Sequence, residues 1–346
     1  MTDFTLLIQE WYRQNSRDLP WRNTKNVYKI WISEVVLQQT RVNQGVSYYN
    51  KLLKNFPDVQ TLAAADEQEI LKHWQGLGYY SRARNLHKAA QQIVDDFKGE
   101  FPKDYDGIKS LKGIGDYTAS AIASFAFDLP YAVLDGNVYR VLSRFFNEYI
   151  PIDTGEGKRV FQNYANQLLD KQSPAIHNQA IMELGALVCK PKNPDCSNCP
   201  VNEICLAYRK GTPTDLPIKS RKVKVRKRYF HYFTFLNDTV QLEQRNDEDI
   251  WGNMFQLPMI EVDKKMTKVE IVVEVNKKYP FRLKRKIHTQ KHILTHQHID
   301  ATFWEINEPF MSEDFVEVNF ENLNNYPLPR LIDRFFEEHR ILFVNQ

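Results

Sequence analysis

Apolar side chains recur at helical spacing along the first part of the chain. Phe4, Ile8 and Trp11 are separated by three or four positions, the interval that places side chains on one face of an α-helix. The stretch YKIWISEVVLQQTRV (28–42) is strongly apolar and predicts another helix. Because little strand-like alternation occurs within 1–185, the pattern predicts an all-α region.

Short glycine-containing segments separate the predicted helices. GLGYYS (76–81), KGIGD (112–116) and LDGN (134–137) have the composition of tight turns. The sequence ADEQEILKHW opens with Asp66 and Glu69 in the register of a capping box, which predicts a helix start at that point. Helices are therefore expected to follow one another through short connections.

The pattern changes in the second part of the chain. The segments RYFHYFTFL (228–236), VEIVVEV (269–275) and IDATFWEI (299–306) are aromatic and β-branched with partial alternation, so each predicts a β-strand. The segment PLPRLIDRFFEEH (327–339) predicts a closing helix after its prolines. These elements together predict an α+β region.

The two patterns predict a multidomain protein. A chain of 346 residues with 42% hydrophobic residues can bury two moderate cores. We predict a helical domain over 1–206, a basic interdomain linker over 207–228 and an α+β domain over 229–346. Within that linker, IKSRKVKVRKR carries seven Lys or Arg in eleven positions, and charge alone favours a solvated segment.

Net charge does not identify a binding partner for this protein, whereas the hydropathy pattern predicts where it is located. The formal net charge of +3 does not by itself indicate nucleic acid. The chain lacks a run of about 18 apolar residues, the minimum for a membrane-spanning helix, and its start lacks the basic and then apolar order of a secretion signal. We therefore expect no membrane association and a cytoplasmic location, at the nucleoid if the protein is bacterial.

All four cysteines of the chain lie within one short segment. Their spacing is C-x6-C-x2-C-x5-C, and the residues are Cys189, Cys196, Cys199 and Cys205. A reducing compartment disfavours structural disulfides, so shared metal ligation is the better interpretation. Four thiolates at this spacing suit either zinc or an iron–sulfur cluster, and spacing alone leaves the metal open.

The stretch LKGIGDYTASAI (111–122) places Gly113 and Gly115 directly before a predicted helix. A turn of this kind allows a phosphate to approach the backbone closely, where the N–H groups of the helix start point toward the anion. An ordinary tight turn between packed helices is an equally good interpretation of the glycines alone.

Two carboxylates have positions suited to cleavage of a glycosidic bond. Glu34 is the one carboxylate in its apolar stretch, and Asp135 immediately precedes a predicted helix. Burial of Glu34 would raise its pKa and keep a proton available, whereas the helix start is expected to lower the pKa of Asp135. Such a pair can protonate a leaving group and stabilise an oxocarbenium ion. Taken alone, a polar helix face with Gln38 and Arg41, and an ordinary N-cap, explain the same residues.

Several segments in order along the chain resemble the helix-hairpin-helix DNA glycosylases, and more narrowly the members that excise adenine. These segments are LPWR, WISEVVLQQTRV, GLGYYSRARNL, LKGIGDYTASAIASFAF, VLDGNVYRVLSR, MELGALVC and the four-cysteine loop. The resemblance implies a helix-hairpin-helix at 111–122 and a [4Fe–4S] cluster held by the loop 189–205. It also implies that Glu34 and Asp135 share one pocket, and that the substrate is adenine opposite 8-oxoguanine or G in double-stranded DNA.

The resemblance also assigns roles to further residues. Bifunctional members of the family carry a nucleophilic lysine two positions after the second hairpin glycine, and this chain has Tyr117 there. A phenol forms no Schiff base, so water is the expected nucleophile and strand cleavage is not expected. The family pattern implies that Tyr117 and Asn137 position Asp135. Other implied roles are adenine contacts by Arg22, Gln179 and Met182, and DNA contacts by Gln39, Tyr79, Gly113 and Gly115.

The region 229–346 resembles the MutT-like (Nudix-like) domain that reads 8-oxoguanine in this family. It lacks the R-E-x-x-E-E helix of the hydrolases, so binding without hydrolysis is expected. Leu294, Thr295 and His296 occupy the place of the family's Phe-Ser-His loop, which implies lesion contacts by Thr295 and His296 and puts a contact by Leu294 in doubt. A metal site formed by the histidines of this region is an alternative, and surface or hydrogen-bonding roles are preferred. These histidines are His288, His292, His296 and His298.

We expect a monomer that binds double-stranded DNA. Two alternatives remain: a bifunctional glycosylase and lyase similar to endonuclease III, disfavoured by Tyr117, and a non-catalytic DNA-binding protein with a metal cluster. In the latter, Glu34 would be part of a polar face and Asp135 only a helix cap.

Overall fold

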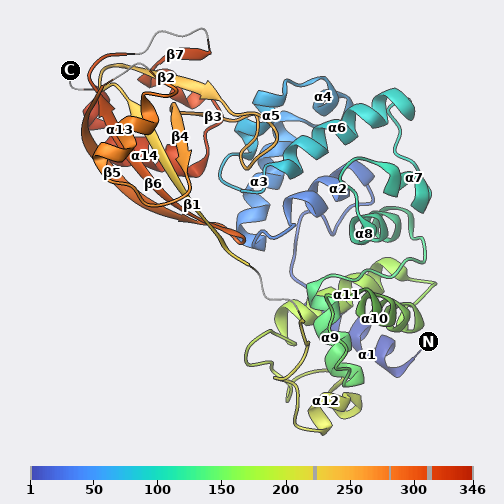
Figure 1. Ribbon diagram of the computed structural model, residues 1–346. Helices are drawn as coiled ribbons and strands as arrows, with labels where there is room; N and C mark the ends of the chain where they lie inside the picture. The colour runs from blue at the N-terminus through green and yellow to red at the C-terminus, as the bar shows by residue number, and fades with distance from the viewer. Residues whose placement is uncertain (1, 221–223, 280–281, 310–313, 345–346) are drawn as a thin grey trace. The chain divides into compact units, whose positions relative to one another are not determined.

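The computed structural model describes residues 2–220, 224–279, 282–309 and 314–344. The chain divides into two compact units (Figure 1). The first unit comprises 1–64 and 85–222, and the second comprises 65–84 and 223–346. The short segment 65–84 is therefore grouped with the carboxy-terminal part of the chain.

The first unit is built from helices joined by short connections. They are α1 (Asp3–Asn15), α2 (Val27–Val36), α3 (Val42–Asn55), α4 (Val59–Ala64), most of α6 (Ser81–Asp96), α7 (Tyr105–Ser110), α8 (Asp116–Phe127), α9 (Gly136–Phe146), α10 (Gly155–Leu168), α11 (Pro174–Leu187), the 3-10 helix η1 (Asn202–Ile204) and α12 (Leu206–Arg209). The predicted all-α region is confirmed. Within the described residues, no helix combines the length and apolarity needed to cross a lipid bilayer.

The apolar pattern predicted one helix over 28–42, and this prediction is wrong. Helix α2 begins after Asn26, whose side chain accepts a hydrogen bond from the Lys29 amide, and ends at Val36. The chain then turns, with Gln39 in the left-handed region at φ +55°, before α3 begins at Val42. A left-handed residue cannot continue a right-handed helix, so Gln38 and Arg41 lie beyond α2 and do not extend its Glu34 face.

One hydrophobic cluster of the first unit lies among α1, α8, α9, α10 and α11. Phe4 and Ile8 of α1 pack there with Val138 and Leu142 of α9 and with Leu184 of α11. All of these side chains are less than 2% exposed. The core therefore holds α9 firmly, and the start of α9 carries one of the two predicted carboxylates.

The second unit contains α5 (Glu67–Trp74) and an α+β region. Its strands are β1 (Arg226–Thr234), β2 (Thr239–Gln244), β3 (Phe255–Gln256), β4 (Met259–Val262), β5 (Leu283–Ile293), β6 (Gln297–Ile306) and β7 (Phe315–Asn319). The remaining elements are α13 (Lys268–Val275), the 3-10 helix η2 (Phe320–Asn325), α14 (Arg330–His339) and α15 (Ile341–Val344). One sheet has the order β4-β1-β6-β5, with β1 and β6 parallel, and the other has the order β3-β2-β7.

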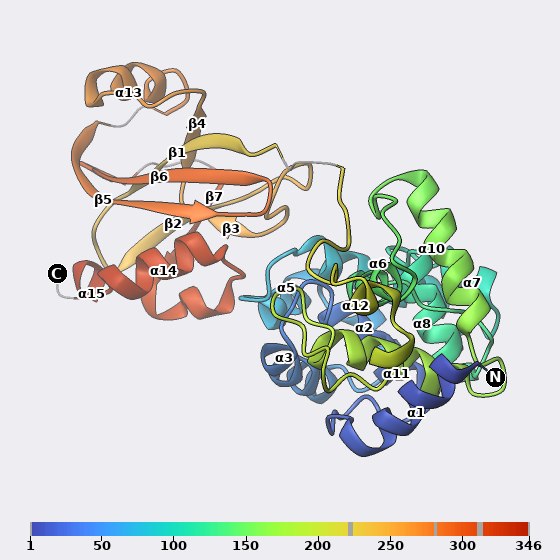
Figure 2. The same ribbon diagram turned by 90° about the horizontal axis from the view of Figure 1, so that it is seen from below.

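Helices cover both faces of the larger sheet (Figure 2). On β6, Phe303 stacks on Phe335 of α14 with ring centroids 3.9 Å apart. Its neighbour Trp304 packs in a different cluster, with Ile271 of α13. Successive side chains of a strand point to opposite faces, so this alternation places α13 and α14 on opposite sides of the sheet.

The predicted strand at 269–275 is wrong, because this segment forms helix α13. Thr267 and Glu270 form a capping box there: the Thr267 side chain accepts from the Glu270 amide, and the Glu270 carboxylate accepts from the Thr267 amide. Only Ile271 and Val275, four positions apart, are buried in the helix. Capping and burial at helical spacing outweigh the β-propensity of the valines.

The helix start at Asp66 is confirmed without the predicted capping box. The Asp66 side chain accepts from the Gln68 amide, whereas Glu69 lies 3.9 Å from the His73 ring nitrogen. The predicted strands at 228–236 and 299–306 and the closing helix are present as β1, β6 and α14. Strand β1 includes the last three residues of the basic run that was interpreted as solvated, and Arg228 is buried within it.

Candidate active site and nucleic-acid interface

A cavity of about 570 Å³ opens within the helical unit. The predicted residues that line it are Arg22, Glu34, Gln39, Tyr117, Asp135, Asn137, Gln179 and Met182. They come from segments far apart in sequence: α2 and the connections before and after it, the starts of α8 and α9, and the middle of α11. The fold thus brings both predicted carboxylates to one cavity large enough for a nucleobase.

Glu34 lies near the end of α2 and is only 6% exposed. The Tyr117 hydroxyl donates a hydrogen bond to Glu34 Oε2 at 2.8 Å. Burial raises the pKa of Glu34 to about 7, because the charged form loses its hydration. The hydrogen bond from Tyr117 favours the carboxylate, and the nearby Asp135 disfavours it. Glu34 can therefore hold a proton near neutral pH.

Asp135 is the N-cap of α9, as predicted. Its Oδ1 accepts from the Asn137 and Val138 amides at 2.9 and 2.8 Å, and its Oδ2 accepts from Asn137 Nδ2 at 2.8 Å. The prediction that its pKa is lowered is wrong: burial raises the pKa of Asp135, and the hydrogen bonds oppose this effect without reversing it. Desolvation of the carboxylate outweighs the favourable field of the helix start.

The different hydrogen bonding of the two carboxyl groups divides their tasks. Burial disfavours the charged form of both groups. Asp135 accepts three N–H donors, whereas Glu34 accepts the Tyr117 hydroxyl. Because N–H donors stabilise a carboxylate, Asp135 is the better anion and Glu34 is the better proton carrier.

Tyr117 lies in the first turn of α8 and acts as a neutral hydrogen-bond donor. Burial raises its pKa far above the usual value, and the neighbouring Glu34 and Asp135 raise it further. The phenol therefore stays protonated and cannot serve as an anionic nucleophile. The family pattern implied that Tyr117 positions Asp135, but its hydroxyl bonds to Glu34, whereas Asn137 bonds to Asp135.

A buried ion cluster beside the cavity escaped the sequence prediction. Glu183 of α11 accepts hydrogen bonds from Arg17 at 2.8 and 2.5 Å and from Arg22 at 2.9 and 2.7 Å. Burial alone would raise the pKa of Glu183, but the two arginines lower it to about 2. Arg22 is thus fixed at the cavity wall by a permanent anion. Glu183 is the one carboxylate in apolar α11, the same signal that drew attention to Glu34.

Gln179 and Met182 also face the cavity from α11. The Tyr12 hydroxyl donates to Gln179 Oε1 at 2.7 Å. This contact leaves the Gln179 amide nitrogen to face a ligand as a donor. The cavity wall therefore combines an oriented amide, the thioether of Met182 and the fixed guanidinium of Arg22.

A second missed residue, Arg140 of α9, connects the cavity to the cysteine loop. Its Nη2 donates to Asn137 Oδ1 at 2.9 Å and to the Gly185 carbonyl at 2.7 Å, and its Nε donates to the Cys189 carbonyl at 2.6 Å. Gly185 has no room for a side chain, since a Cβ there would lie 2.7 Å from Asn137 Cβ and 3.0 Å from its carbonyl oxygen. Helices α9 and α11 therefore approach most closely beside Asn137.

The predicted hairpin connects α7 to α8 through 111–115. Gly113 has φ +78°, a conformation that favours glycine, and a Cβ there would meet the Asn85 side chain at 2.6 Å. Gly115 has an extended backbone and open space around its Cα. Gly113 is thus required by the turn itself, whereas Gly115 leaves the start of α8 uncovered for an approaching group.

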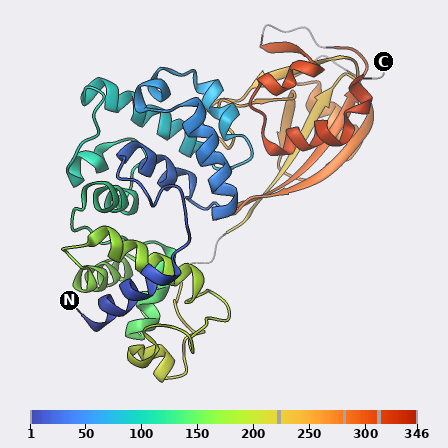
Figure 3. The ribbon, with the colours of Figure 1, turned by 180° about the vertical axis from the view of Figure 1, so that it is seen from behind.

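The segment between α11 and α12 (yellow-green in Figure 3) carries the four cysteines, which line one small cavity. Arg144 Nη1 donates to Cys189 Sγ at 3.3 Å, and Cys205 Sγ lies 3.5 Å from the Arg144 carbonyl. Four cysteines around one cavity, with a guanidinium beside one of the sulfurs, fit an anionic metal–thiolate centre. Cys189, Cys196, Cys199 and Cys205 are the residues that would hold it.

The other residues predicted to contact DNA have left-handed backbone conformations or exposed side chains. Gln39 in the first unit and Tyr79 in the second adopt left-handed conformations, with φ of +55° and +49°. Non-glycine residues in this region are strained, and such strain collects at functional sites. Within the second unit, the exposed Tyr79 hydroxyl lies 2.6 Å from Thr295 Oγ1.

Thr295 and His296 lie in the short turn between β5 and β6 and are both exposed. Leu294, the residue in place of the family aromatic, is partly buried. Among the described residues, His288 has Glu338 and His339 near enough to share a metal, but His292, His296 and His298 are not part of that group. His292 packs on the Trp251 ring, with centroids 5.5 Å apart, whereas His288 lies 3.7 Å from Glu338 and packs on His339.

Family models match three parts of the chain. Residues 32–153 match the HhH-GPD superfamily of base excision DNA repair proteins, and residues 189–205 match the iron-sulfur binding domain of endonuclease III. Residues 231–338 match the NUDIX domain. The predicted fold class, a helix-hairpin-helix domain with an α+β MutT-like domain, is confirmed. The metal left open by the cysteine spacing is iron, and the cofactor is an iron–sulfur cluster, which is of the [4Fe–4S] type in this family.

Curated relatives resemble the chain over most of its length. It is 34% identical over 303 residues to the adenine DNA glycosylase of Buchnera aphidicola subsp. Schizaphis graminum, which covers 85% of this chain and 84% of the relative. A second adenine DNA glycosylase, from Buchnera aphidicola subsp. Acyrthosiphon pisum, is 30% identical over 97% of both chains. The human adenine DNA glycosylase is 40% identical over 61% of this chain and 40% of its own length.

Solved structures agree with the helical part of the fold. A thermostable thymine-DNA glycosylase superposes with a TM-score of 0.56 at 27% identity, covering 60% of this chain and 95% of that chain. A trapped endonuclease III–DNA covalent intermediate gives a TM-score of 0.52 at 22% identity, with 61% and 99% covered. The latter likeness concerns the fold alone.

Proposed function

Since this chain belongs to the adenine DNA glycosylases, we propose that it removes adenine paired with 8-oxoguanine or guanine and leaves the DNA strand intact. The reaction is hydrolysis of the N-glycosidic bond of adenine in base excision repair. One observation carries the mechanism: a buried carboxyl group, Glu34, holds a proton near neutral pH in the same cavity as Asp135. We further propose that the protein acts as a monomer and works in the cytoplasm, at the nucleoid if it is bacterial.

Binding begins at the hairpin. The uncovered amides before α8, at Gly115, suit a phosphate of the damaged strand. Gln39 and Tyr79 enter the base stack, and adenine leaves the duplex for the cavity. Extrusion of a base costs a few kcal/mol, which contacts with Arg22, Gln179 and Met182 offset in part.

In the cavity, Glu34 donates its proton to N7 of adenine. The bond between C1′ and N9 then breaks, its electron pair goes to the base, and positive charge develops on the sugar. Asp135, held by Asn137, stabilises or briefly traps this cation. Water adds to C1′, and its proton passes to the Glu34 carboxylate, which restores the acid and leaves an abasic site.

Because position 117 is a tyrosine, the reaction ends at the abasic site without strand cleavage. A lysine at this position would attack the sugar and form a Schiff base that leads to strand cleavage. The phenol of Tyr117 remains protonated and bonded to Glu34. This observation favours the glycosylase over the glycosylase and lyase of the endonuclease III kind.

The MutT-like domain reads the base opposite adenine. The Thr295 hydroxyl and the His296 imidazole lie exposed on one turn and can meet the N7–H and the 8-oxo group that distinguish 8-oxoguanine from guanine. Two such hydrogen bonds give roughly 1–3 kcal/mol of discrimination together.

The decisive test of the reaction uses a duplex with adenine opposite 8-oxoguanine under single-turnover conditions. Strand breaks should appear only after alkali, which cleaves abasic sites. Breaks before alkali, at the rate of adenine release, would establish a lyase and refute the role of Tyr117. A duplex with adenine opposite thymine serves as the control and should remain uncut.

Lesion reading is tested with the double variant Thr295→Ala, His296→Ala. Its preference for adenine opposite 8-oxoguanine over adenine opposite guanine should fall about tenfold. His298→Ala, an exposed histidine on the same hairpin, is the matched control and should keep the preference. An unchanged preference in the double variant would move lesion reading away from this turn.

A further inference from the structure

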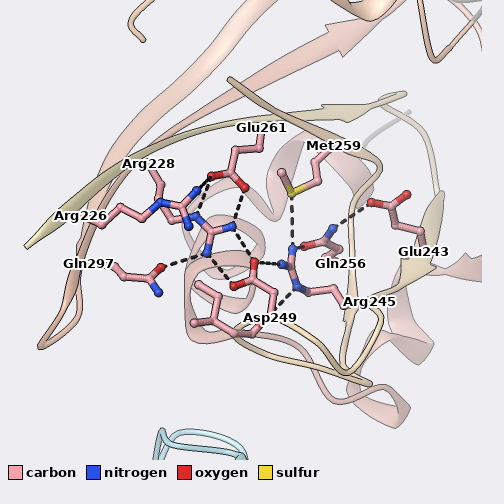
Figure 4. Close-up of polar contacts among 10 residues, drawn as sticks. Arg226, Arg228, Glu243, Arg245, Asp249, Gln256, Met259, Glu261 and Gln297 are labelled. Carbon is pink, nitrogen blue, oxygen red and sulfur yellow. Dashed lines mark hydrogen bonds and ion pairs between the residues drawn. The ribbon is translucent and has the colours of Figure 1, made fainter. Parts of the chain in front are cut away.

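The guanidinium of Arg228, on β1, is bonded at every N–H although it is only 4% exposed (Figure 4). Its Nε and Nη2 donate to Glu261 at 2.8 and 2.5 Å, and its Nη1 and Nη2 donate to Asp249 at 2.8 and 2.5 Å. Its Nη1 also donates to Gln297 Oε1 at 2.9 Å. A guanidinium has five donors in a fixed plane, so this arrangement allows one orientation only.

The partners of Arg228 come from three other parts of the second unit. Glu261 belongs to β4, Asp249 lies in the connection between β2 and β3, and Gln297 is the first residue of β6. Gln297 follows His296 directly in the chain. Arg228 therefore connects the sheet to the end of the turn that carries the two proposed lesion-reading residues.

The backbone fixes the same end of the turn. The Arg226 amide donates to the His296 carbonyl at 2.9 Å, and the Leu294 amide donates to the Gln297 carbonyl at 2.8 Å. The side chain of Gln297, at the same end of the turn, accepts from Arg228 Nη1 (Figure 4). This bond is charge-assisted and partly buried, which makes it stronger than a bond between neutral exposed groups.

A second arginine supports the network. Arg245 Nη2 donates to Asp249 Oδ2 at 2.9 Å, and its Nε donates to the Ile250 carbonyl at 3.0 Å. The next residue, Trp251, packs on His292 near the end of β5. The connection that holds Arg228 therefore also touches the strand that enters the turn.

We propose that Arg228 and Gln297 are positioning residues for recognition of the base opposite adenine. The inference rests on the proposed reading of that base by Thr295 and His296. Hydrogen bonds discriminate between two bases only when their donors and acceptors are held in place before contact. A turn anchored to a buried guanidinium with all its hydrogen bonds made meets this requirement. An exposed turn held by its backbone alone would have to be ordered on binding, which would reduce the discrimination between the two bases.

The test uses Gln297, because its change leaves both ion pairs of Arg228 intact. Gln297→Leu removes the acceptor at similar size, and Gln297→Glu keeps an oxygen acceptor. Gln290→Leu is the matched control: Gln290 lies on β5 and donates to the Leu331 carbonyl at 2.7 Å, away from the turn. Single-turnover excision, duplex affinity and thermal unfolding are measured for adenine opposite 8-oxoguanine and opposite guanine.

Gln297→Leu should lower the preference for 8-oxoguanine about 3- to 10-fold, with the loss carried by the 8-oxoguanine duplex. Gln297→Glu should retain the preference, and Gln290→Leu should retain it even if it lowers the melting temperature as much. An unchanged preference in Gln297→Leu, or an equal loss in Gln297→Glu, would overturn the proposal.

The variant that lacks both Thr295 and His296 side chains separates two kinds of failure. If it loses the preference while Gln297→Leu keeps it, the turn reads the lesion and only the positioning role fails. If neither variant loses the preference, lesion reading by the turn fails and the positioning role fails with it.

Discussion

The cavity of the helical unit and the arginine network of the α+β unit both bury ionisable groups, with opposite results. Burial of Glu34 meets one hydroxyl donor and raises its pKa to about 7. Burial would also raise the pKa of Asp249, but hydrogen bonds from Arg228 reverse the effect and lower it. An incompletely satisfied carboxyl group can exchange its proton, whereas a saturated pair is fixed in charge and position.

This difference shows that the partners of a buried charge, and not burial itself, decide whether it serves chemistry or geometry. Glu34 can hold a proton near neutral pH because no cation among the described residues forms an ion pair with it. Glu183, in the same unit, is held ionised by Arg17 and Arg22, with its pKa lowered to about 2. Glu34 and Glu183 line the same cavity, yet their partners give them different pKa values and different roles.

The largest expected effect is the loss of catalysis in Glu34→Gln. The amide preserves shape but cannot protonate N7, so adenine excision should fall about 10³-fold with little change in duplex affinity. Single-turnover rates and binding on the same duplex measure this. Glu10→Gln changes a glutamate that is 61% exposed and should match the native rate. Excision by Glu34→Gln within a few-fold of native would remove Glu34 from the mechanism.

The next largest expected effect is a loss of folding stability in Arg228→Met. It leaves Asp249 and Glu261, each about a third exposed, without their common cation, and the loss of hydrogen bonds to charged groups costs about 2–3 kcal/mol. Chemical denaturation of the full chain measures the loss. The control is Arg226→Met, whose side chain is 65% exposed. Equal stability of the two variants would contradict the contrast between the sites.

Glu34→Gln should have the opposite effect on stability. The pKa of Glu34 rises from 4.5 in the unfolded chain to about 7 in the folded one, so the native protein loses stability as pH rises through this window. The glutamine does not ionise and escapes that loss. The variant should exceed native stability by about 1–3 kcal/mol near pH 8, with the gain shrinking toward about pH 5. A variant less stable than native at alkaline pH would refute the assignment of Glu34 as a poorly satisfied buried acid.

The smallest expected effect is a shift of the pH profile in Tyr117→Phe. Excision by the native protein should fall tenfold per pH unit above about 7, because the reaction needs protonated Glu34. The Tyr117 hydrogen bond lowers the pKa of Glu34, so its removal should move the fall to higher pH by about one unit or less. Excision rates measured between about pH 6 and 9 test the shift, and a move to lower pH would contradict it.

Local features of the site were readable from the sequence because each depends on a few adjacent residues. The Asp135 cap and the Gly113 turn follow from preferences of the backbone at those positions. The helix break after Val36 was missed, because nothing in the apolar stretch marks Gln39 as left-handed. The helix at 268–275 was missed because its capping residue, Thr267, lies outside the valine-rich segment that suggested a strand.

Features that depend on distant partners were not readable. The basic run ending at Arg228 looked solvated, and only the register of β1 against β4 and β6 places its last arginine between Glu261 and Gln297. The pKa of Asp135 was predicted from its helix alone, whereas its burial comes from the other elements around the cavity. Long-range packing therefore sets the electrostatics that local pattern cannot.

Gly185 carries a consequence for the interpretation of sequence variants. It has no functional group, yet any side chain at this position would collide with Asn137, which holds Asp135. A saturation scan of α11 scored by mutation rate in cells should rank Gly185 with the acids of the cavity, while exposed Ile176 on the same helix accepts most replacements. Substitutions at position 185 would abolish activity because α9 and α11 lie too close together for a side chain, and not because Gly185 takes part in the reaction. A ranking of variants by loss of activity alone would therefore wrongly count Gly185 as a catalytic residue.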